Sequence, residues 1–401
     1  MTEIHEFSDD QCLMTGDTFL LAADLVSVPS VSFNEARITD LIEESLDDNS
    51  GHLDVFRIGD NLVARTDLGR QWRLILAGHT DTVPPSSNAE ARIEGDVLWG
   101  VGSADMKGGL AVMLELALNS RWPIVDVTYV FYAREEVDSV HSGLREVAEA
   151  RPDLLAGDVA LLLEPTGGIV EAGCQGTMRV EVTLAGERAH TARGWMGRNA
   201  VHRLGPLLDV VDSYEPRRPV ISGCEFREGL QAVGVGGGVA GNVVPDKAAL
   251  TINHRFAPDR TPEQAEQHVR SVIEPVLEPG DAMEVLDMAP PADPGLEHPL
   301  LKAVVRNSGA PPRAKLGWTD AAFFAQRGVP ASNFGPGDPL LAHTSHEQLH
   351  RDSLHKVYRV LEDLLIDGTL PQGTRECPEW EGSIPKRLPD LQGPSSSGAS
   401  W

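Results

Sequence analysis

Residues 130–139 read VFYAREEVDS, a strand-like run that is followed by a pair of acidic residues. The first four residues are apolar or aromatic and favour a buried β-strand. Two adjacent glutamates, Glu135 and Glu136, follow almost directly. Neighbouring carboxylates at the end of a buried strand repel each other and lose hydration, unless they point into water or meet a cation. The stretch therefore indicates either a solvated strand end or a cation-binding site.

Two further apolar runs resemble this strand. Residues 71–78 (QWRLILAG) and 158–165 (DVALLLEP) are short, apolar and end in polar or turn residues, as buried strands of an α/β sheet do. Between them, residues 106–120 (MKGGLAVMLELALNS) have a helical pattern after a glycine-rich turn. The amphipathic pattern of residues 34–48 predicts another helix. This alternation predicts an α/β domain.

The pattern changes near Thr177. Residues 177–187 (TMRVEVTLAGE) alternate apolar and polar side chains, which is typical of a half-exposed antiparallel strand. The following segments predict two helices and two more strands. The helices are expected at 199–214 and 261–277, and the strands at 248–258 and 281–288. A small α+β unit with a one-sided sheet is therefore expected within the α/β domain.

This change in pattern divides the chain into four parts. We expect residues 1–176 to form the first part of a catalytic domain and residues 177–290 an inserted domain. Residues 291–370 would complete the catalytic domain after a proline-rich hinge. Residues 371–401 are rich in Pro, Gly and Ser and are expected to be a poorly ordered tail.

Composition limits the partners. The chain of 401 residues has a formal net charge of -26, which argues against nucleic acids and anionic membrane surfaces as partners. Its four cysteines are widely spaced and form no CxxC pair, so neither a disulfide framework nor a thiolate zinc site is expected. The N-terminus has no apolar signal region, and no apolar run is long enough to span a membrane. We therefore expect a cytoplasmic protein.

Polar side chains that can bind a metal follow several of the apolar runs. They are His79, Asp81, Asp105, Glu135, Glu136, Glu164, His343 and His346. Each has an ordinary explanation when taken alone, as a helix cap, a surface histidine or a solvated carboxylate. Because ligand sites of open α/β sheets lie at the carboxyl ends of the strands, we expect these side chains to converge on one crevice.

The residue types favour a metal pair. Imidazole together with carboxylate suits zinc, cobalt or manganese better than magnesium. The number of candidates fits two ions better than one, because two metals about 3.5–4 Å apart can share one bridging carboxylate. One glutamate of the adjacent pair could then bind metal while the other acts as a base.

Several motifs, in this order, resemble the di-zinc aminoacylase, acetylornithine deacetylase and desuccinylase peptidase family. They are GHTDTVP (78–84), GVGSADMKGGLA (100–111), the glutamate pair, LLLEPT (161–166), GERAHTARGWMGRNA (186–200), GNVVPD (241–246) and AHT (342–344). The resemblance covers residues 15–368. It implies a mixed-sheet di-zinc hydrolase domain interrupted by a smaller α+β dimerisation or lid domain, and hence a homodimer.

The resemblance also implies a metal-ligand set. Asp105 would bridge two zinc ions, with Co²⁺ or Mn²⁺ as substitutes. His79 and Glu164 would complete the ligands of one ion. Glu136 and His343 would complete those of the other.

Neighbouring residues receive supporting roles from the same resemblance. Glu135 would be the general base, and Asp81 would accept the second ring N–H of His79. His343 is preferred to His346 because the family has a glutamate four residues after the ligand, here Glu347. The family also has a cis peptide bond after the bridging aspartate, here Asp105–Met106.

The expected inserted domain supplies further candidates by resemblance. His190 matches a histidine that enters the partner subunit's site and stabilises the oxyanion. Asn242 and Arg255 match substrate-contact positions, and Thr319 in the later GWTD segment is another candidate. Without the motifs, His190 and Arg255 would be read as ordinary surface residues at strand positions.

Within the family, four segments are most similar to actinobacterial succinyl-diaminopimelate desuccinylases, namely residues 170–180, 237–246, 315–324 and 333–343. The implied reaction is hydrolysis of N-succinyl-LL-2,6-diaminopimelate, a small-molecule substrate. Residues 173–177 (GCQGT) depart from the GRRGS of better-known desuccinylases, so the arginines are absent there. Arg179, Arg255 or another cation would have to replace them, or the acyl group differs.

This departure keeps other functions open. The chain could be an acetylornithine deacetylase, an aminoacylase or a dipeptidase with the same fold and metals. A non-catalytic binding relative is a further alternative. Such a relative should have lost the base or a metal ligand, whereas this chain has Glu135 and all five ligand candidates.

Overall fold

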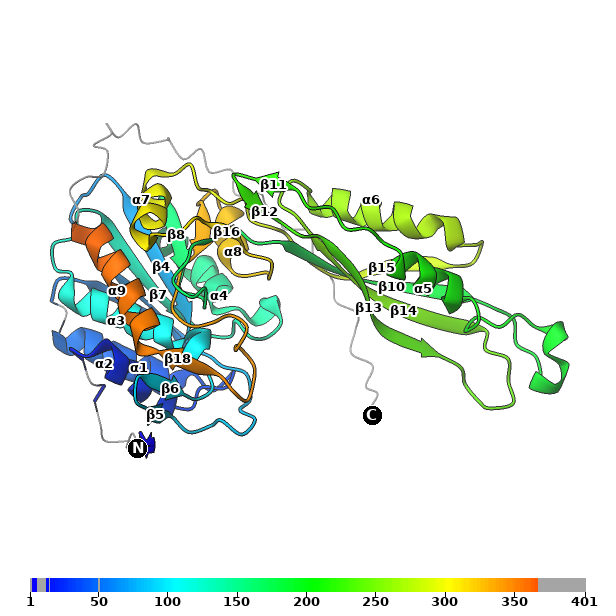
Figure 1. Cartoon of the computed structure of the whole chain (residues 1–401), viewed down its shortest axis with the longest axis horizontal. Helices are drawn as coiled ribbons and strands as arrows, with labels where there is room; N and C mark the ends of the chain where they lie inside the picture. Colours follow the sequence, from blue (N-terminus) through cyan, green and yellow to red (C-terminus); the bar gives the residue numbers. More distant parts are fainter. Residues whose placement is uncertain (1, 6–11, 14, 50, 367–401) are drawn as a thin grey trace. The chain divides into compact units, whose positions relative to one another are not determined.

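The computed structural model describes residues 2–5, 12, 13, 15–49 and 51–366, coloured along the chain in Figure 1. The expected tail, residues 371–401, lies outside the described residues. The described part contains two principal sheets, one of eight strands and one of four.

The eight-stranded sheet has the order β16-β9-β17-β8-β4-β7-β3-β2. Its strands are β2 (Asp54–Ile58), β3 (Asn61–Arg65), β4 (Arg73–His79), β7 (Asp126–Tyr132), β8 (Val159–Leu162), β9 (Glu171–Ala172), β16 (Arg313–Ala314) and β17 (Ala331–Asn333). Strands β17, β8, β4 and β7 run parallel, whereas β2, β3 and the β9–β17 pair are antiparallel. The sheet is therefore mixed, as the family resemblance implied.

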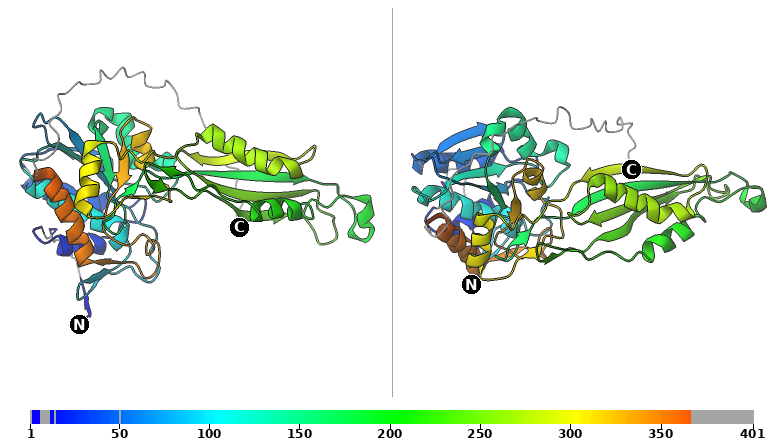
Figure 2. Two further views of the ribbon diagram at one scale, coloured as in Figure 1. Left: turned by 45° about the horizontal axis from the view of Figure 1, so that its top comes forward. Right: turned by 90° about the horizontal axis from the view of Figure 1, so that it is seen from above.

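Helices cover both faces of this sheet (Figures 1 and 2). They are α1 (Thr18–Ser27), α2 (Ala36–Asn49), α3 (Gly108–Asn119), α4 (Gly143–Ala150), α7 (Pro299–Ser308), α8 (Ala321–Ala325) and α9 (Arg351–Ile366). Successive strand residues point to opposite faces. Leu74 and Leu76 thus join the core with α1, α2, α3, α7 and α9, while Ile75 and Ala77 join the core with α4 and α8.

The four-stranded sheet is antiparallel, with the order β13-β14-β10-β15. Its strands are β10 (Gly176–Ala185), β13 (Gly229–Gly237), β14 (Lys247–Phe256) and β15 (Ala282–Ala289). Helices α5 (Leu204–Asp212) and α6 (Pro262–Ile273) cover one of its faces and share a separate core with it. This arrangement suits a one-sided sheet, and residues 176–289 are called the insert below.

Shorter elements complete the described chain. A small sheet has the order β1-β5-β6-β18, and β11 pairs with β12. Their bounds are β1 (Thr2–Ile4), β5 (Arg92–Glu94), β6 (Val97–Trp99), β11 (Val220–Ile221), β12 (Cys224–Glu225) and β18 (Gln348–His350). The short helical turns are Ser103–Lys107, Ser139–His141, Pro152–Leu155, Thr191–Met196 and Glu274–Val276. In the described part of the chain, no helix joins enough length with enough apolar character to span a bilayer.

Most predicted elements are present, with two informative differences. The helix predicted at 199–214 begins only at Leu204, because Pro206 is tolerated in the first turn of a helix but not in its interior. Strand β13 was not predicted, because GLQAVGVGG contains four glycines and glycine weakens a strand interior. Contacts with β14 along its length override this weak propensity.

Candidate active site

Three neighbouring parallel strands bring most of the candidate residues together. In the order β8-β4-β7, His79 is the last residue of β4. The glutamate pair follows the end of β7, and Glu164 follows the end of β8. The carboxyl ends of parallel neighbours lie at one edge of the sheet, so these side chains share a crevice.

Asp105 reaches this crevice from the turn before α3. The turn Ser103–Lys107 has the cis peptide bond Asp105–Met106 that the resemblance implied. The Glu347 carboxylate accepts hydrogen bonds from the backbone N–H groups of Ala104 and Asp105, both at 3.0 Å. Glu347 therefore fixes the backbone from which Asp105 projects.

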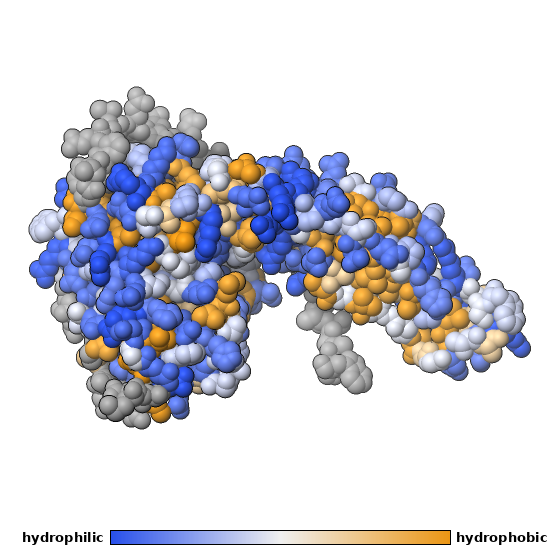
Figure 3. Space-filling view, viewed as in Figure 1, coloured by the Kyte–Doolittle hydropathy of each residue, from blue (hydrophilic) through white to orange (hydrophobic). Residues whose placement is uncertain are grey.

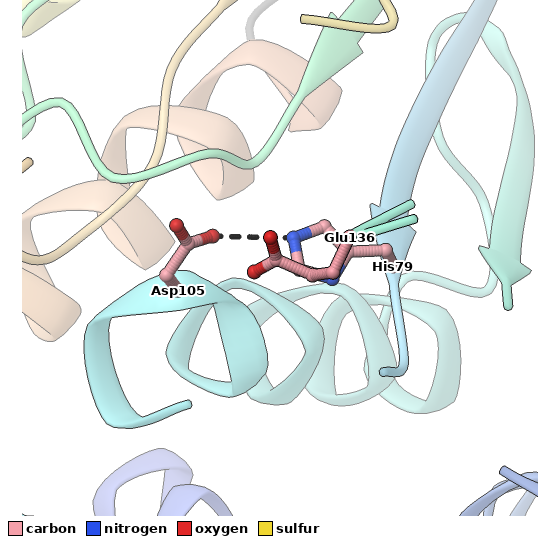
Figure 4. A group of neighbouring side chains, drawn as sticks. All are labelled: His79, Asp105 and Glu136. Carbon is pink, nitrogen blue, oxygen red and sulfur yellow. Dashed lines mark hydrogen bonds and ion pairs between the residues drawn. The ribbon is translucent and has the colours of Figure 1, made fainter. Parts of the chain in front are cut away.

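The two oxygens of Asp105 face different histidines. Its Oδ1 lies 3.1 Å from Nε2 of His79, and its Oδ2 lies 3.5 Å from Nε2 of His343. His343 Nε2 is also 2.9 Å from the Glu136 carboxylate. Figure 4 shows the Asp105 carboxylate directed at the His79 ring, with Glu136 beside them. A carboxylate placed between two imidazoles can serve two cations at once.

Asp81 organises the glutamate pair. Its carboxylate accepts the backbone N–H of Glu135 at 3.0 Å and that of Glu136 at 3.1 Å, and the Ser32 hydroxyl at 2.8 Å. Nδ1 of His79 lies 3.0 Å from the Asp81 carbonyl and 3.5 Å from its carboxylate. The nearer acceptor for the ring is thus the carbonyl. The carboxylate mainly holds the two glutamates, a role that the sequence did not suggest.

The carboxylates of the crevice are electrostatically strained without cations. Burial, with the charges of Glu164, Asp320 and Glu136 added, raises the pKa of Glu135 well above its usual value, although His79 opposes the shift. Burial and the charge of Asp105 raise the pKa of Glu164 to about 7. Glu135 and Glu136 therefore do not simply point into water, and the second explanation of the VFYAREEVDS stretch is the better one.

The donors fit divalent metal ions. Ligand atoms of His79, Asp105 and Glu136 all lie within 4.8 Å of one another. Glu164 is buried, and its Oε1 has no hydrogen-bond partner among the described residues. A buried carboxylate oxygen without a partner is costly, and a metal ion would satisfy it. Imidazole nitrogens and carboxylate oxygens are the ligands that zinc accepts.

A cavity of about 170 Å³ adjoins Glu135. It is also lined by Ser142, Thr177, Trp318 and Asp320. Thr177 belongs to β10 of the insert, so residues of the insert and residues outside it both line the cavity. Space next to the candidate base is where a substrate must sit for proton transfer.

The candidate substrate-binding residues differ from the crevice residues in their surroundings. His190 and Asn242 are exposed and adjacent, since the Thr191 N–H donates to the Asn242 carbonyl at 3.1 Å. Neither side chain makes a hydrogen bond or ion pair with the described crevice residues. Arg255 is partly buried, and its guanidinium has no hydrogen bond or ion pair with a described residue. Thr319 is buried, and its hydroxyl donates to Oδ1 of Asn333 at 2.9 Å.

Three buried charged residues near the crevice were not singled out from the sequence. Burial lowers the pKa of Lys107 to about 7 and raises that of Asp320 to about 6. Lys315 forms an ion pair with Glu171 at 3.0 Å. The only sequence signal for Lys107 and Asp320 was their place in the motifs, two residues after Asp105 and one residue after Thr319.

Comparison with known proteins identifies the family. The profile of Peptidase family M20/M25/M40 matches residues 75–367, which is more than half of the chain. The chain belongs to this family. Among solved structures, an M20 dinuclear metal-binding peptidase, YxeP of Bacillus subtilis, has a TM-score of 0.64 at 16% identity, covering 87% of this chain and 96% of that chain. A tripeptidase of Staphylococcus aureus has a TM-score of 0.70 at 20% identity, covering 88% and 98%.

Two M20 relatives are much more similar in sequence. The succinyl-diaminopimelate desuccinylase of Corynebacterium glutamicum is 42% identical over 360 residues, which is 88% of this chain and 97% of the relative. The DapE protein of Mycobacterium tuberculosis is 49% identical over 336 residues, which is 84% of this chain and 94% of the relative. The alignments cover nearly the whole length of both relatives.

Proposed function

We propose that this M20 protein hydrolyses N-succinyl-LL-2,6-diaminopimelate to succinate and LL-2,6-diaminopimelate, in lysine and diaminopimelate biosynthesis. The observation that carries the reaction type is Asp105, whose two carboxylate oxygens face two histidines beside Glu135. The similarity to the Corynebacterium glutamicum desuccinylase supports the substrate. The enzyme would work in the cytoplasm as a homodimer with two zinc ions per subunit, and Co²⁺ or Mn²⁺ could replace zinc.

Each crevice residue has a distinct task in this reaction. Asp105 would hold both ions, His79 and Glu164 one of them, and Glu136 and His343 the other. When bound, the metal pair supplies Lewis acidity towards the amide carbonyl and lowers the pKa of the attacking water.

Glu135 would move the protons. Its carboxylate has no hydrogen bond or ion pair with a described residue, and it borders the cavity. It can therefore take the proton of the attacking water and deliver it to the leaving nitrogen. Asp81 holds the backbone of Glu135 and thereby directs the base.

An assay of amine release tests this function. Purified zinc-loaded protein is given N-succinyl-LL-diaminopimelate, N-acetylornithine, other N-acetyl amino acids and dipeptides. We expect the highest kcat/KM for the succinyl substrate. A preference for N-acetylornithine or a dipeptide would instead support one of the other M20 activities, and no turnover of any substrate would support a binding relative.

The edge of the insert's sheet supports the proposed homodimer. Strand β13 pairs only with β14 among the described strands, and its Val233 and Val235 are exposed. Apolar side chains gather over this part of the insert in Figure 3, where Figure 1 labels β13 and β15. An exposed, unpaired and apolar edge favours pairing with a second copy.

The local geometry of His190 supports a role as a hydrogen-bond donor in a partner's site. The Ala192 N–H donates to Nδ1 of His190 at 3.0 Å, so the neutral ring carries its proton on Nε2. That N–H is free to stabilise an oxyanion. Because His190 has no contact with the crevice of its own chain, we propose that it completes the site of the second subunit.

Mixing two inactive variants should therefore restore activity. A His190→Ala subunit retains Glu135, and a Glu135→Gln subunit retains His190, so each mixed dimer has one complete site if His190 acts across the interface. After subunit exchange we expect about a quarter of the wild-type activity, for random pairing of subunits. No recovery in exchanged dimers, or an active monomer in light scattering, would contradict the role of His190 across the interface.

Arg255 should contribute strongly to substrate binding. Its partly buried guanidinium lacks a protein partner, and Arg255 lies opposite Thr177 of the cavity in the β10–β14 pair. Arg255→Ala should cost about 2–5 kcal/mol in kcat/KM if it binds a substrate carboxylate in a partly desolvated site. The exposed Arg179 of the same sheet provides the matched control, Arg179→Ala.

Comparing two substrates shows which part of the substrate Arg255 contacts. A larger loss for N-succinyl- than for N-acetyl-diaminopimelate would place Arg255 at the acyl carboxylate. Equal losses would place it at the amino-acid end of the substrate or make it structural. A larger loss in Arg179→Ala than in Arg255→Ala would show that the wrong arginine has been assigned.

A further inference from the structure

The proposed substrate carries a carboxylate on its acyl chain, and a chain of net charge -26 must supply local positive charge for it. Three other cations near the crevice are already engaged. Lys107 donates to the Val28 carbonyl at 2.6 Å, and Arg134 pairs with Glu146. Arg327 lies over the Phe323 ring at 3.5 Å. Lys315 differs from these, because it belongs to a group with an excess of positive charge.

Lys315 and Arg313 share a single carboxylate. Nζ of Lys315 lies 3.0 Å from Oε2 of Glu171, while Nε of Arg313 lies 2.9 Å from Oε1 of the same side chain. The group therefore carries one uncompensated positive charge. The Arg313 side chain is 49% exposed, whereas that of Lys315 is 11% exposed. Water can hydrate the charge of Arg313. The less exposed charge of Lys315 is therefore the one that a further anion would stabilise more.

Lys315 interacts electrostatically with carboxylates of the crevice. The charges of Glu164 and Asp105 both act on it, together with that of Glu171. The ion pair with Glu171 at 3.0 Å favours the charged form of Lys315. Glu164 and Asp105 are committed to metal in the proposed function, which leaves Lys315 available to a further anion.

The backbone places Lys315 against the 173–177 segment. The N–H of Gln175 donates to the Lys315 carbonyl at 3.2 Å, and the N–H of Lys315 donates to the Ala172 carbonyl at 3.4 Å. At the end of this segment, Thr177 lines the cavity next to Glu135 and stands opposite Arg255 in the sheet register. Lys315 and Arg255 thus approach the same short segment from two different elements.

We propose that Lys315 is a specificity-determining residue that binds, together with Arg255, the terminal carboxylate of a dicarboxylic acyl group. The inference rests on the proposed function and names a contact for its substrate. Arg313 keeps Glu171 neutralised, so Lys315 can turn from Glu171 to the substrate without leaving an unpaired carboxylate behind. The substrate class is amides of dicarboxylic acids, as opposed to acetyl amides.

The test compares two substrates that differ only in this carboxylate, N-succinyl- and N-acetyl-LL-diaminopimelate. Lys315→Met keeps the length of the side chain and removes its charge. We expect kcat/KM for the succinyl substrate to fall about 30-fold or more, and that for the acetyl substrate to change less than about 3-fold. Lys315→Arg should restore part of the preference, because it returns the charge.

Arg313→Met is the matched control. It removes the other cation of Glu171, on the exposed side, and should leave the succinyl-to-acetyl ratio unchanged. Equal losses on both substrates in Lys315→Met, or the same ratio change in Arg313→Met, would overturn the proposal and make Lys315 a structural partner of Glu171. If Lys315→Met does not fold, the double variant Lys315→Met/Glu171→Gln removes both buried charges and is judged by the same ratio.

Failure of this inference is distinguishable from failure of the proposed function. A wild-type protein that does not prefer the succinyl substrate refutes the function. Suppose instead that the wild-type protein prefers the succinyl substrate while the succinyl-to-acetyl ratio of kcat/KM stays unchanged in both the single and the double Lys315 variants. That result refutes only the role of Lys315. Binding of succinate to the zinc-loaded protein, measured by calorimetry, gives a second readout and should weaken in Lys315→Met but not in Arg313→Met.

Discussion

Glu135→Gln should lower kcat about 100- to 10,000-fold while two metal ions remain bound, since this is the usual contribution of a general base. The amide of glutamine has the shape of the carboxylate but cannot accept the proton of the attacking water. Glu135 is free for this task, because its carboxylate makes no hydrogen bond or ion pair with a described residue and faces the cavity. Stopped assays of amine release together with metal analysis of the same sample provide the measurement.

Glu136→Gln is the matched variant one residue away. The Glu136 carboxylate lies 2.9 Å from Nε2 of His343 and belongs to the metal-binding group, so this change should lower metal occupancy first and activity as a consequence. Both variants retain the backbone N–H groups that Asp81 accepts. Loss of metal in Glu135→Gln with full occupancy in Glu136→Gln would reverse the two assignments.

The convergence of most site residues could be predicted, because it follows from the parallel strands of the sheet. Once three apolar runs are read as parallel strands, His79, Glu135, Glu136 and Glu164 must share an edge. The positions of Asp105 and His343 do not follow from strand ends, since one lies in a turn before a helix and the other in a loop after β17. The residue pattern placed these two among the candidates for the crevice, but only the family resemblance assigned them as metal ligands.

The contacts that hold the site were harder to predict, because their partners are distant in sequence. Asp81 was expected to orient His79, but its carboxylate also holds the backbone of Glu135 and Glu136. Lys315 was not singled out from the sequence, because its ion pair with Glu171 exists only once β9 and β16 lie side by side. Tertiary pairing of charges has no local pattern that a sequence could reveal.

In the insert, too, some elements could be predicted from a local pattern and one could not. Its alternating strands β10, β14 and β15 were predicted from their period-two pattern. Its edge strand β13 was hidden by glycines, and this strand is the one on which the proposed dimer depends. The division of the chain into 1–176, 177–290 and 291–370 remains a prediction, although residues 176–289 have their own sheet and core.

Removing the metals should abolish turnover, and Asp105→Asn should imitate their removal. The two oxygens of Asp105 lie 3.1 and 3.5 Å from the two histidines, so one substitution weakens both metal sites together. An amide offers one neutral oxygen and cannot bridge two cations as a carboxylate can. We expect the variant to retain at most one metal and no measurable activity after dialysis at a zinc concentration that saturates the wild type.

Thermal stability provides a readout that does not depend on turnover. A ligand that binds only the folded state at about 100 times its Kd adds about 2.7 kcal/mol of stability, so zinc should raise the Tm of chelator-treated wild-type protein markedly. The rise should be much smaller in Asp105→Asn. Asp320→Asn is the control for metal binding, because Asp320 is a buried carboxylate of the same region that contacts neither histidine. Full activity of the chelated wild-type protein, or an undiminished Tm rise and two bound metals in Asp105→Asn, would refute the bridging role of Asp105.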